Sequence, residues 1–461
     1  MRMLSGLLLA TERRAIIGLA SLYASRMLGL FMVLPVLALY ADDLAGATPL
    51  LIGLALGAYG LTQAILQIPF GLLSDRIGRK TVIAAGLVLF MLGSVVAALA
   101  DSIGGVILGR CLQGSGAVAA AIMALLADQT REQVRTAAMA TIGMSIGVAF
   151  ALAMVIGPWL ASGFGLAGVF WFTALLAAVS LLVLWRLVPQ APRRLRHRDV
   201  LLDRAQLKAT LGRSDLVRLD VSIFALHLIL MAIFVAVPFR LLEVGIAIPH
   251  HGWVYFGVMA LAFVVMVPLV IFAEKRQRMR GVFLLAVGGM ALCLLGLGAL
   301  PVGLVSLGLL LLGFFTAFNL LEATLPSMLS KLAPAGAKGT AMGVYSTSQF
   351  LGAFLGGVLG GGLAQQWGLD AVFYGCALVG LGWLAAIWGM PAPRHLASEV
   401  VALDEQAHGD ALETLMERFA DVAGVEDVLV VPEERLAYLK VDRQRLDSDA
   451  LARVVGIKRN H

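Results

Sequence analysis

Long apolar runs separated by short polar segments dominate the hydrophobic pattern of this 461-residue chain. The runs are close to the ~20 residues that a helix needs to cross ~30 Å of hydrocarbon. Alternation with a period of two, which is typical of membrane barrels, is missing from the runs. A backbone inside a bilayer must satisfy its own polar groups. The pattern therefore predicts an α-helical protein that crosses a membrane several times.

Charged residues and Gly/Pro breaks divide the apolar runs into twelve predicted spans. The first six cover roughly 15–40, 50–70, 80–100, 103–126, 138–162 and 166–187, and the second six roughly 219–243, 251–273, 281–300, 303–328, 339–364 and 369–390. An even number of spans places both termini on the same side of the membrane.

Lys and Arg gather in alternate loops. The segment 189–218 carries eight Lys/Arg against three Asp, whereas opposite loops such as ADDLAGATP are nearly free of cations. Because cation-rich loops stay cytosolic, both termini are predicted to be cytosolic, in a bacterial inner membrane. The N-terminal MRMLSGLLLATERRA is interpreted as a cytosolic lead-in and not as a signal peptide, since its apolar part is too short.

Composition excludes several classes of protein. The chain is 60% hydrophobic, 14% charged and has a mean hydropathy of +0.91, which excludes a water-soluble protein. Cys111, Cys293 and Cys376 lie in apolar runs without CxxC spacing, so neither a disulfide framework nor a thiolate metal site is expected. The sequence holds no Walker motif, so ATP is not the expected energy source. No enzyme activity, cofactor, metal or nucleic-acid partner is predicted.

A weak internal repeat divides the membrane part. Pro69 and the loop GLLSDRIGRK recur 199 residues later as Pro268 and VIFAEKRQRM, which aligns Asp75 with Glu274. Duplicated six-helix halves are common in transporters. The repeat therefore predicts two homologous helical bundles, at 1–188 and 219–390, joined by a basic cytosolic linker at 189–218.

Composition changes abruptly after Pro391. Residues 391–461 carry nine Lys/Arg and fourteen Asp/Glu, a net of −5, which leaves +11 on the rest of the chain. Their pattern predicts a strand (EVVALD), a helix (ALETLMERFADV), two strands (VEDVLVV and RLAYLKVD) and a second helix (SDALARVV). This order indicates a small soluble α+β domain of ferredoxin-like type with a short or missing last strand.

Several motifs carry a family resemblance. GLLSDRIGRK resembles motif A of the major facilitator superfamily, LGRCLQGSG at 108–116 resembles the Arg-x-x-Gln-Gly motif of the fourth helix, and Asp128 with Arg135 resembles the acid and arginine that follow it. Only Gly157 and Pro158 match the antiporter motif of the fifth helix. Runs such as RMLGLFMVLPVL and AGAKGTAMGVYSTSQFLG are similar to members with twelve helices followed by a ferredoxin-like cytosolic domain. The resemblance implies a twelve-helix fold of two six-helix bundles.

The resemblance also implies a conformational latch. Its expected residues are Gly71, Asp75, Arg76, Gly78, Arg79, Lys80, Asp128 and Arg135. Asp75 would accept amide hydrogens at the start of the eleventh helix, near Lys338 to Thr340, and Arg79 would bridge Asp75 to Asp128. Such contacts would hold the cytosolic side shut and favour an outward-facing state. The alternative is that the loop acts only as a positive-inside signal.

Ionisable groups inside spans are costly and are candidates for function. Those considered are His227 and Glu322 as proton-coupling residues, and Arg26 and Arg110, with the polar Gln113 and Asn319, as cavity or substrate residues. In the superfamily fold, all of them fall on cavity-lining helices. His227 and Glu322 could carry a proton or could simply join two helices by a hydrogen bond. Arg26 and Arg110 could attract an anionic or carbonyl-bearing substrate, or could pair with backbone carbonyls and Gln113.

We therefore expect a secondary active transporter that exports small amphiphilic solutes by proton antiport and alternating access. The alternatives are a proton-coupled importer of a sugar or metabolite, and a transporter-like sensor that signals through the C-terminal domain. The expected transport unit is a monomer. The C-terminal domain has the hairpin rhythm of heavy-metal-associated domains but no cysteine, which leaves a regulatory, partner-binding or self-association role.

Overall fold

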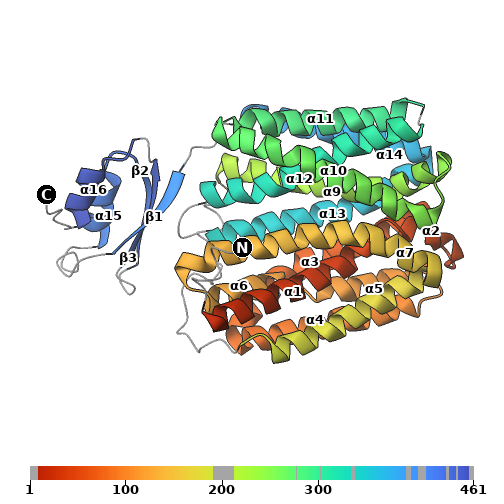
Figure 1. Cartoon of the computed structure of the whole chain (residues 1–461), viewed down its shortest axis with the longest axis horizontal. Helices are drawn as coiled ribbons and strands as arrows, with labels where there is room; N and C mark the ends of the chain where they lie inside the picture. Colours follow the sequence, from red (N-terminus) through yellow and green to blue (C-terminus); the bar gives the residue numbers. More distant parts are fainter. Residues whose placement is uncertain are drawn as a thin grey trace. The chain divides into compact units, whose positions relative to one another are not determined.

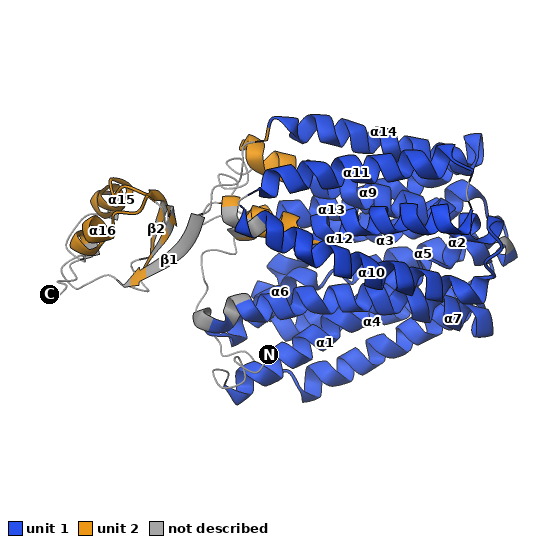
Figure 2. Cartoon of the chain, turned by 45° about the horizontal axis from the view of Figure 1, so that its top comes forward, with its two compact units in different colours: residues 1–200, 220–322, 343–389 blue, residues 201–219, 323–342, 390–461 orange. Residues whose placement is uncertain are grey.

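The computed structural model describes residues 9–189, 212–276, 278–301, 303–333, 338–390, 396–402, 412–431, 436–442 and 445–455. These residues divide into two compact units, shown in different colours in Figure 2. The first comprises 1–200, 220–322 and 343–389, and the second comprises 201–219, 323–342 and 390–461. Most of the predicted basic linker, 190–211, lies outside the described residues.

The apolar runs form helices that lie side by side in the first unit (Figure 1). Their bounds are α1 Ala10–Met32, α2 Leu37–Tyr40, α3 Pro49–Ile77, α4 Arg79–Ala98, α5 Ile103–Ser115, α6 Ala119–Gln129, α7 Glu132–Arg186, α9 Ser214–Glu243, α10 Ile248–Lys275, α11 Met279–Ala299, α12 Leu304–Leu332, α13 Lys338–Trp367 and α14 Leu369–Trp388. Each predicted span coincides largely with these helices, but two are interrupted: 15–40 breaks at 33–36, between α1 and α2, and 103–126 breaks at 116–118, between α5 and α6. Helix α9 begins five residues before its predicted span.

Ten helices among the described residues are long and apolar enough to cross a membrane. One of them, Ala137–Arg186, has 50 residues and bends at Gly165, whose φ of 65° favours glycine, so it holds two predicted spans. Helix α13 is not among the ten, because its glycines and polar YSTSQ run lower its hydropathy, yet it is a continuous helix of 30 residues. With these two spans added, the predicted twelve-helix architecture is confirmed for the described residues.

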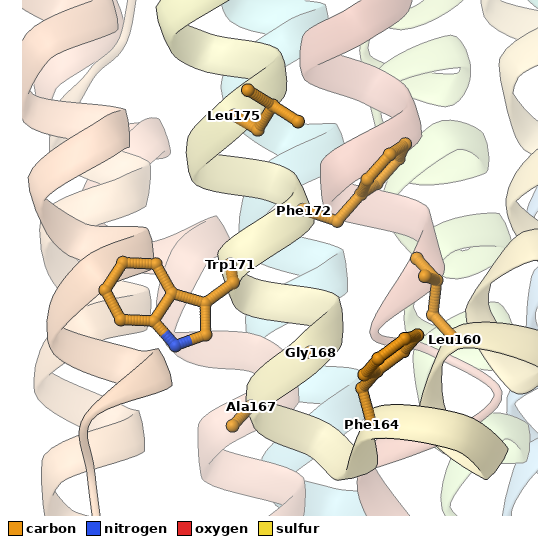
Figure 3. Close-up of a pocket in the computed structure, with 7 residues that line it drawn as sticks. All are labelled: Leu160, Phe164, Ala167, Gly168, Trp171, Phe172 and Leu175. Carbon is orange, nitrogen blue, oxygen red and sulfur yellow. The ribbon is translucent and has the colours of Figure 1, made fainter.

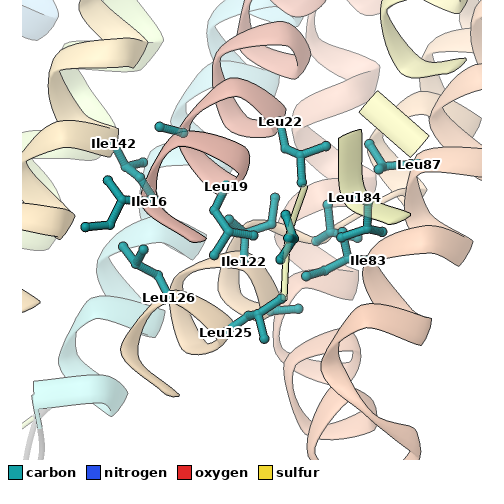
Figure 4. Packing of buried hydrophobic residues seen from close by; sticks show 14 of the residues in the cluster. Ile16, Leu19, Leu22, Ile83, Leu87, Ile122, Leu125, Leu126, Ile142 and Leu184 are labelled. Atoms are coloured by element: carbon teal, nitrogen blue, oxygen red, sulfur yellow. The ribbon is translucent and has the colours of Figure 1, made fainter. Parts of the chain in front are cut away.

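Aliphatic side chains fill the centre of the N-terminal bundle. Leu19, Ile83, Ile122 and Leu125 belong to a buried cluster built from α1, α4, α6 and α7 (Figure 4). In a bilayer, lipid tails are as apolar as leucine, so close van der Waals packing and small residues hold such helices together. At Gly157 of α7, an added Cβ would lie 2.5 Å from the carbonyl oxygen of Met32 in α1. This close approach sets the position of α1 against α7.

The C-terminal segment of the second unit forms the predicted α+β domain. It contains β1 Leu396–Ala402, α15 Leu412–Ala420, β2 Val425–Val431, β3 Leu436–Asp442 and α16 Ser448–Val455. The three strands pair antiparallel in the order β1-β3-β2, with Val400 and Leu429 both opposite Tyr438. Alternate residues of β3, at Ala437, Leu439 and Val441, are buried with Phe419 of α15. The predicted element order, with no fourth strand among the described residues, is confirmed.

Candidate functional site

A polar contact, buried at His227 and partly exposed at Gln349 and Glu322, joins three helices of the C-terminal bundle. The Nε2 atom of His227 on α9 lies 2.8 Å from Nε2 of Gln349 on α13, and the same amide nitrogen lies 3.4 Å from Oε1 of Glu322 on α12. His227 Nε2 and Glu322 Oε2 are 3.8 Å apart. The structure thus brings the two predicted proton-coupling residues together and places Gln349 between them.

The contacts of His227 relate its protonation state to the orientation of Gln349. Its Nδ1 lies 3.3 Å from the carbonyl oxygen of Ile223, which can only accept a hydrogen bond. With the Gln349 amide nitrogen turned toward Nε2, Nε2 acts as the acceptor, which suits the neutral imidazole with its proton on Nδ1. If Nε2 took up a proton, the Gln349 amide would have to turn its oxygen toward it. Proton uptake at His227 therefore requires a rearrangement of Gln349.

Several polar atoms around this contact have no hydrogen-bond partner among the described residues. They include Oε2 of Glu322 and Nδ2 of Asn319, one turn earlier on α12. Asn319 is 7% exposed. An unpaired polar group in a dry site costs free energy, and such groups commonly mark a site that receives water, a proton or a ligand.

The N-terminal bundle holds a second buried network, centred on Arg26 of α1. Its Nη2 donates to the Tyr59 hydroxyl at 2.6 Å and to Oε1 of Gln63 at 2.5 Å, both on α3. Gln63 in turn donates to Gln67 at 3.1 Å. Arg26 is 2% exposed, and its Nε and Nη1 have no partner among the described residues. Arg26 is thus a buried cation with two free donors.

Arg110 has a different environment. Its guanidinium donates to Oε1 of Gln113 at 2.9 Å and to the carbonyl oxygens of Ala55 at 3.3 Å and Leu56 at 3.4 Å. Gln113 continues the network to the Ser94 hydroxyl at 2.8 Å. Arg110 is fully buried. Of the two predicted alternatives, the structure shows the pairing with carbonyls and Gln113 for Arg110.

Tyr23 relates the two networks to each other. It is within electrostatic range of Arg26, Tyr59 and Glu322. The ring of Tyr59 also lies beneath the guanidinium groups of Arg26 and Arg110, 5.8 Å and 5.2 Å from their central carbons. The candidate cation of one bundle and the candidate proton carrier of the other therefore both interact electrostatically with Tyr23.

The predicted latch residues meet where α3 ends. Nη1 of Arg79 lies 2.7 Å from Oδ1 of Asp75, and its Nε lies 2.5 Å from Oδ2 of Asp128. Gly78, with φ 102°, ends α3 and lets the chain turn directly into α4. Arg79 therefore bridges the two acids as expected. The contact of Asp75 with the start of α13 remains a prediction.

The other latch residues differ in their surroundings. Lys80 donates to the carbonyl oxygen of Val188 at 2.7 Å, while Arg76 is exposed. A Cβ at Gly71 would meet only Ala120, at 3.6 Å, so this glycine is not needed for space. The side chain of Arg135 lies outside the described residues.

Sequence reasoning missed a buried ion pair at this end of the bundle. Glu12, 3% exposed, accepts from the Arg131 side chain at 2.8 Å and 3.0 Å and from the Arg131 backbone at 3.0 Å. The Glu12 carboxylate raises the pKa of the Arg131 guanidinium through this side-chain hydrogen bond. Glu12 lies in the stretch interpreted from the sequence as a cytosolic lead-in, and the sequence gives no sign of its partner 119 residues away.

A surface groove at the bend of α7 is not the candidate site. Seven residues of that helix line it, shown in Figure 3: Leu160, Phe164, Ala167, Gly168, Trp171, Phe172 and Leu175. Phe164 and Trp171 are exposed, as expected of apolar side chains that face lipid. The groove contains no ionisable group, so it offers no means of proton coupling.

Comparisons with known proteins agree with this fold and these motifs. Residues 19–318 and 219–421 match the model of the Major Facilitator Superfamily, and 401–450 match that of the YajR YAM domain. The inner membrane transport protein YajR of Escherichia coli K12 is 46% identical over 432 residues, which cover 94% of each chain. The multidrug resistance protein MdtH of Aeromonas salmonicida is 27% identical, over 73% of this chain and 84% of MdtH.

Solved structures show the same fold at lower identity. The nucleoside transporter NupG has a TM-score of 0.66 and 15% identity, over 82% of this chain and 99% of that chain. A D-xylose-proton symporter has a TM-score of 0.65 and 18% identity, over 83% and 98%. The chain therefore belongs to the Major Facilitator Superfamily, as a multi-pass inner-membrane secondary transporter that carries a YAM domain after its helices.

Proposed function

We propose that the protein exports small amphiphilic solutes in exchange for protons by alternating access. The observation that carries the proposal is the contact of His227, Gln349 and Glu322. Ionisable side chains within membrane-spanning helices are costly and are commonly retained for proton or ion transport. Because Gln349 must rearrange when His227 is protonated, proton binding changes the contacts between α9, α12 and α13.

Arg26 supplies the proposed solute contact. Its free Nε and Nη1 can donate to a carboxylate or carbonyl oxygen, and the aromatic rings of Tyr59 and Phe90 beside it suit an apolar body. Tyr23 places Arg26 within reach of the charge state of Glu322. A proton on Glu322 and a solute on Arg26 therefore influence each other electrostatically, which is what obligatory exchange requires.

Everted membrane vesicles test the proposal. Respiration acidifies their interior, and a pH-sensitive dye follows the gradient while an amphiphilic carboxylate, a lipophilic cation or a sugar is added. An exporter should discharge the gradient when its solute is added, because protons leave as the solute enters. Glu322→Gln should abolish the discharge, whereas Asp101→Asn, which alters an exposed loop carboxylate, should not.

The direction of the pH change inside the vesicles distinguishes antiport from proton-coupled import. Further acidification of the interior on addition of a sugar would indicate an importer and would contradict antiport. A response that persists unchanged in both Glu322→Gln and His227→Gln would contradict the assignment of the proton site while leaving transport itself intact.

A further inference from the structure

A third acid lies buried in the C-terminal bundle. Asp220, two turns into α9, is 8% exposed, and its Oδ1 has no hydrogen-bond partner among the described residues. Burying an unpaired carboxylate is so costly that such groups usually hold a proton instead. Nothing in the packing of α9 requires an acid at this position, since its neighbours Leu219 and Ile223 are apolar core residues.

The packing of α9 against α13 places Asp220 beside a polar segment. Cβ atoms at Gly352, Gly356 and Gly360 would lie 2.2 Å, 2.1 Å and 2.7 Å from the backbone of Phe224, Leu228 and Ala232. The offset of 128 residues is constant and the numbers rise together, so the two helices run parallel in a fixed register. The same register puts Asp220 level with Ser348, within the run Tyr345 to Gln349.

Tyr345 supplies the intermediate position. Its side chain is 3% exposed, its hydroxyl has no hydrogen-bond partner among the described residues, and it is within electrostatic range of both Asp220 and Glu322. Gln349 follows Tyr345 by four residues and so lies on the same face of α13. Helices α9, α12 and α13 therefore present a series of polar groups along one face. These are the carboxyl of Asp220, the phenol of Tyr345, the carboxyl of Glu322 and the amide of Gln349, which binds His227.

The spacing requires an intermediary. Asp220 and His227 are seven residues apart on one helix, which is about 10.5 Å along the axis, too far for direct proton transfer. We propose that Asp220 is a third proton-carrying group, and that Tyr345 relays protons between it and Glu322. This inference rests on the proposed proton coupling at His227 and Glu322 and extends it toward the Ser214 end of α9.

The transfer step is balanced. The Tyr345 hydroxyl has no hydrogen bond to either carboxyl here, so the transfer takes place in a conformation that brings it within hydrogen-bond distance of both. There Asp220, as the carboxylic acid, gives its proton to the Tyr345 oxygen while the phenolic proton of Tyr345 passes to the Glu322 carboxylate. One O–H bond breaks and one forms at the phenol, so Tyr345 stays neutral, Asp220 becomes the carboxylate and Glu322 becomes the acid. Among the described residues, the charged or titratable groups that face the path are Asp220 and His227 from α9, Tyr345 from α13, Glu322 from α12 and Tyr23 from α1.

Carbodiimide labelling of the full-length purified protein tests whether Asp220 holds a proton. Dicyclohexylcarbodiimide reacts with protonated carboxyls in apolar surroundings, and peptide mass spectrometry locates the product. We expect labelling at Asp220 and Glu322, and none at the exposed Asp101. An unlabelled Asp220 beside a labelled Glu322 would overturn the inference and leave the proposed function standing.

Exchange of the Glu322 carboxyl proton tests the relay. Infrared spectroscopy in reconstituted membranes follows the shift of its C=O band after transfer to heavy water. Asp220→Asn and Tyr345→Phe should each lower the rate of this exchange at least about tenfold, a factor that corresponds to one pKa unit in free energy. Asp220→Glu should restore the rate. Thermal unfolding identifies a variant that is merely misfolded.

The outcomes separate the two proposals. Unchanged exchange in folded Asp220→Asn or Tyr345→Phe would overturn the relay. Failure of Glu322 to label, together with solute movement that leaves the vesicle pH gradient unaltered, would instead overturn the proposed proton coupling.

Discussion

At the scale of single residues, the structure separates two arginines that look alike in the sequence. Both lie within apolar helices and both are buried, yet Arg110 has oxygen acceptors from Gln113, Ala55 and Leu56, whereas two nitrogens of Arg26 have none. Satisfied buried charges specify structure, while an unsatisfied one costs stability and is available to a ligand. Arg26 is therefore the candidate for binding and Arg110 for folding.

Substituting each arginine tests this distinction. Arg110→Gln should lower the free energy of unfolding, by about 1–3 kcal/mol for each buried acceptor left without a donor. Arg26→Gln should leave stability equal or higher, because it removes a buried charge, while it abolishes stabilisation by an amphiphilic carboxylate. Thermal unfolding in detergent with and without the carboxylate measures both effects. The opposite order of stabilities would contradict the assignment.

At the scale of elements, α3 carries different contacts at its two ends. Near Pro49 it packs on α13 backbone to backbone, where a Cβ at Gly53 would lie 2.0 Å from the Gly357 oxygen and one at Gly361 would lie 2.3 Å from the Pro49 oxygen. The Leu50 amide also donates to Gln365 at 3.2 Å. This end of the two helices is closed in the structure. The glycines of α13 thus allow the close approach of its backbone to α3.

Gly357→Ala should open this end. The added methyl group collides with rigid backbone at 2.3 Å, so the helices must separate. Gly289→Ala is the matched control, since a Cβ there meets nothing within 4 Å, and it should stabilise α11 by up to about 1 kcal/mol through helix propensity. Distances between spin labels at the Pro49 end of α3 and the Trp367 end of α13 should lengthen only in the first variant.

Asp75→Asn tests the other end of α3. It removes one of the two acids that hold Arg79, and a partly exposed contact of this kind contributes about 0.3–2 kcal/mol. We expect the ratio of the state open at this end to the closed state to rise by a factor of up to a few tens, and transport to be slower. Cysteine accessibility in intact cells measures the shift, with Arg14→Gln as the comparison for loss of an exposed charge outside the latch. Equal accessibility in wild type and Asp75→Asn would count against a latch.

At the scale of the whole molecule, the chain combines a large helical membrane part with a small α+β domain that has its own core. Phe419→Ala should unfold the small domain alone, because losing a buried Phe costs about 3–5 kcal/mol and a domain of this size has little more in total. Glu417→Ala, an exposed site on the same helix, is the control. Limited proteolysis should cut after Pro391 in the first variant and leave the helices intact. Protection of the domain in Phe419→Ala would show that its stability comes from elsewhere.

Much of this architecture is predictable from local patterns. Span number, the two strands of the VEDVLVV and RLAYLKVD hairpin, and the helix at Ser448–Val455 all follow from hydrophobic periodicity. The meeting of Arg79 with Asp75 and Asp128 follows from a motif. Mean hydropathy alone does not identify helix α13 as a span. Its composition reflects packing on neighbouring helices rather than contact with lipid.

Bilayer thickness and backbone hydrogen bonding are general constraints, and for that reason the sequence alone specifies a polytopic helical transporter with an acidic α+β domain. Contacts between helices distant in the chain obey no such local rule. Only tertiary packing places Gln349 between His227 and Glu322, pairs Arg131 with Glu12 and supplies backbone carbonyls to Arg110. It also buries Asp220 Oδ1 and the Tyr345 hydroxyl without a hydrogen-bond partner among the described residues. The candidate chemistry of the protein depends on these distant pairings.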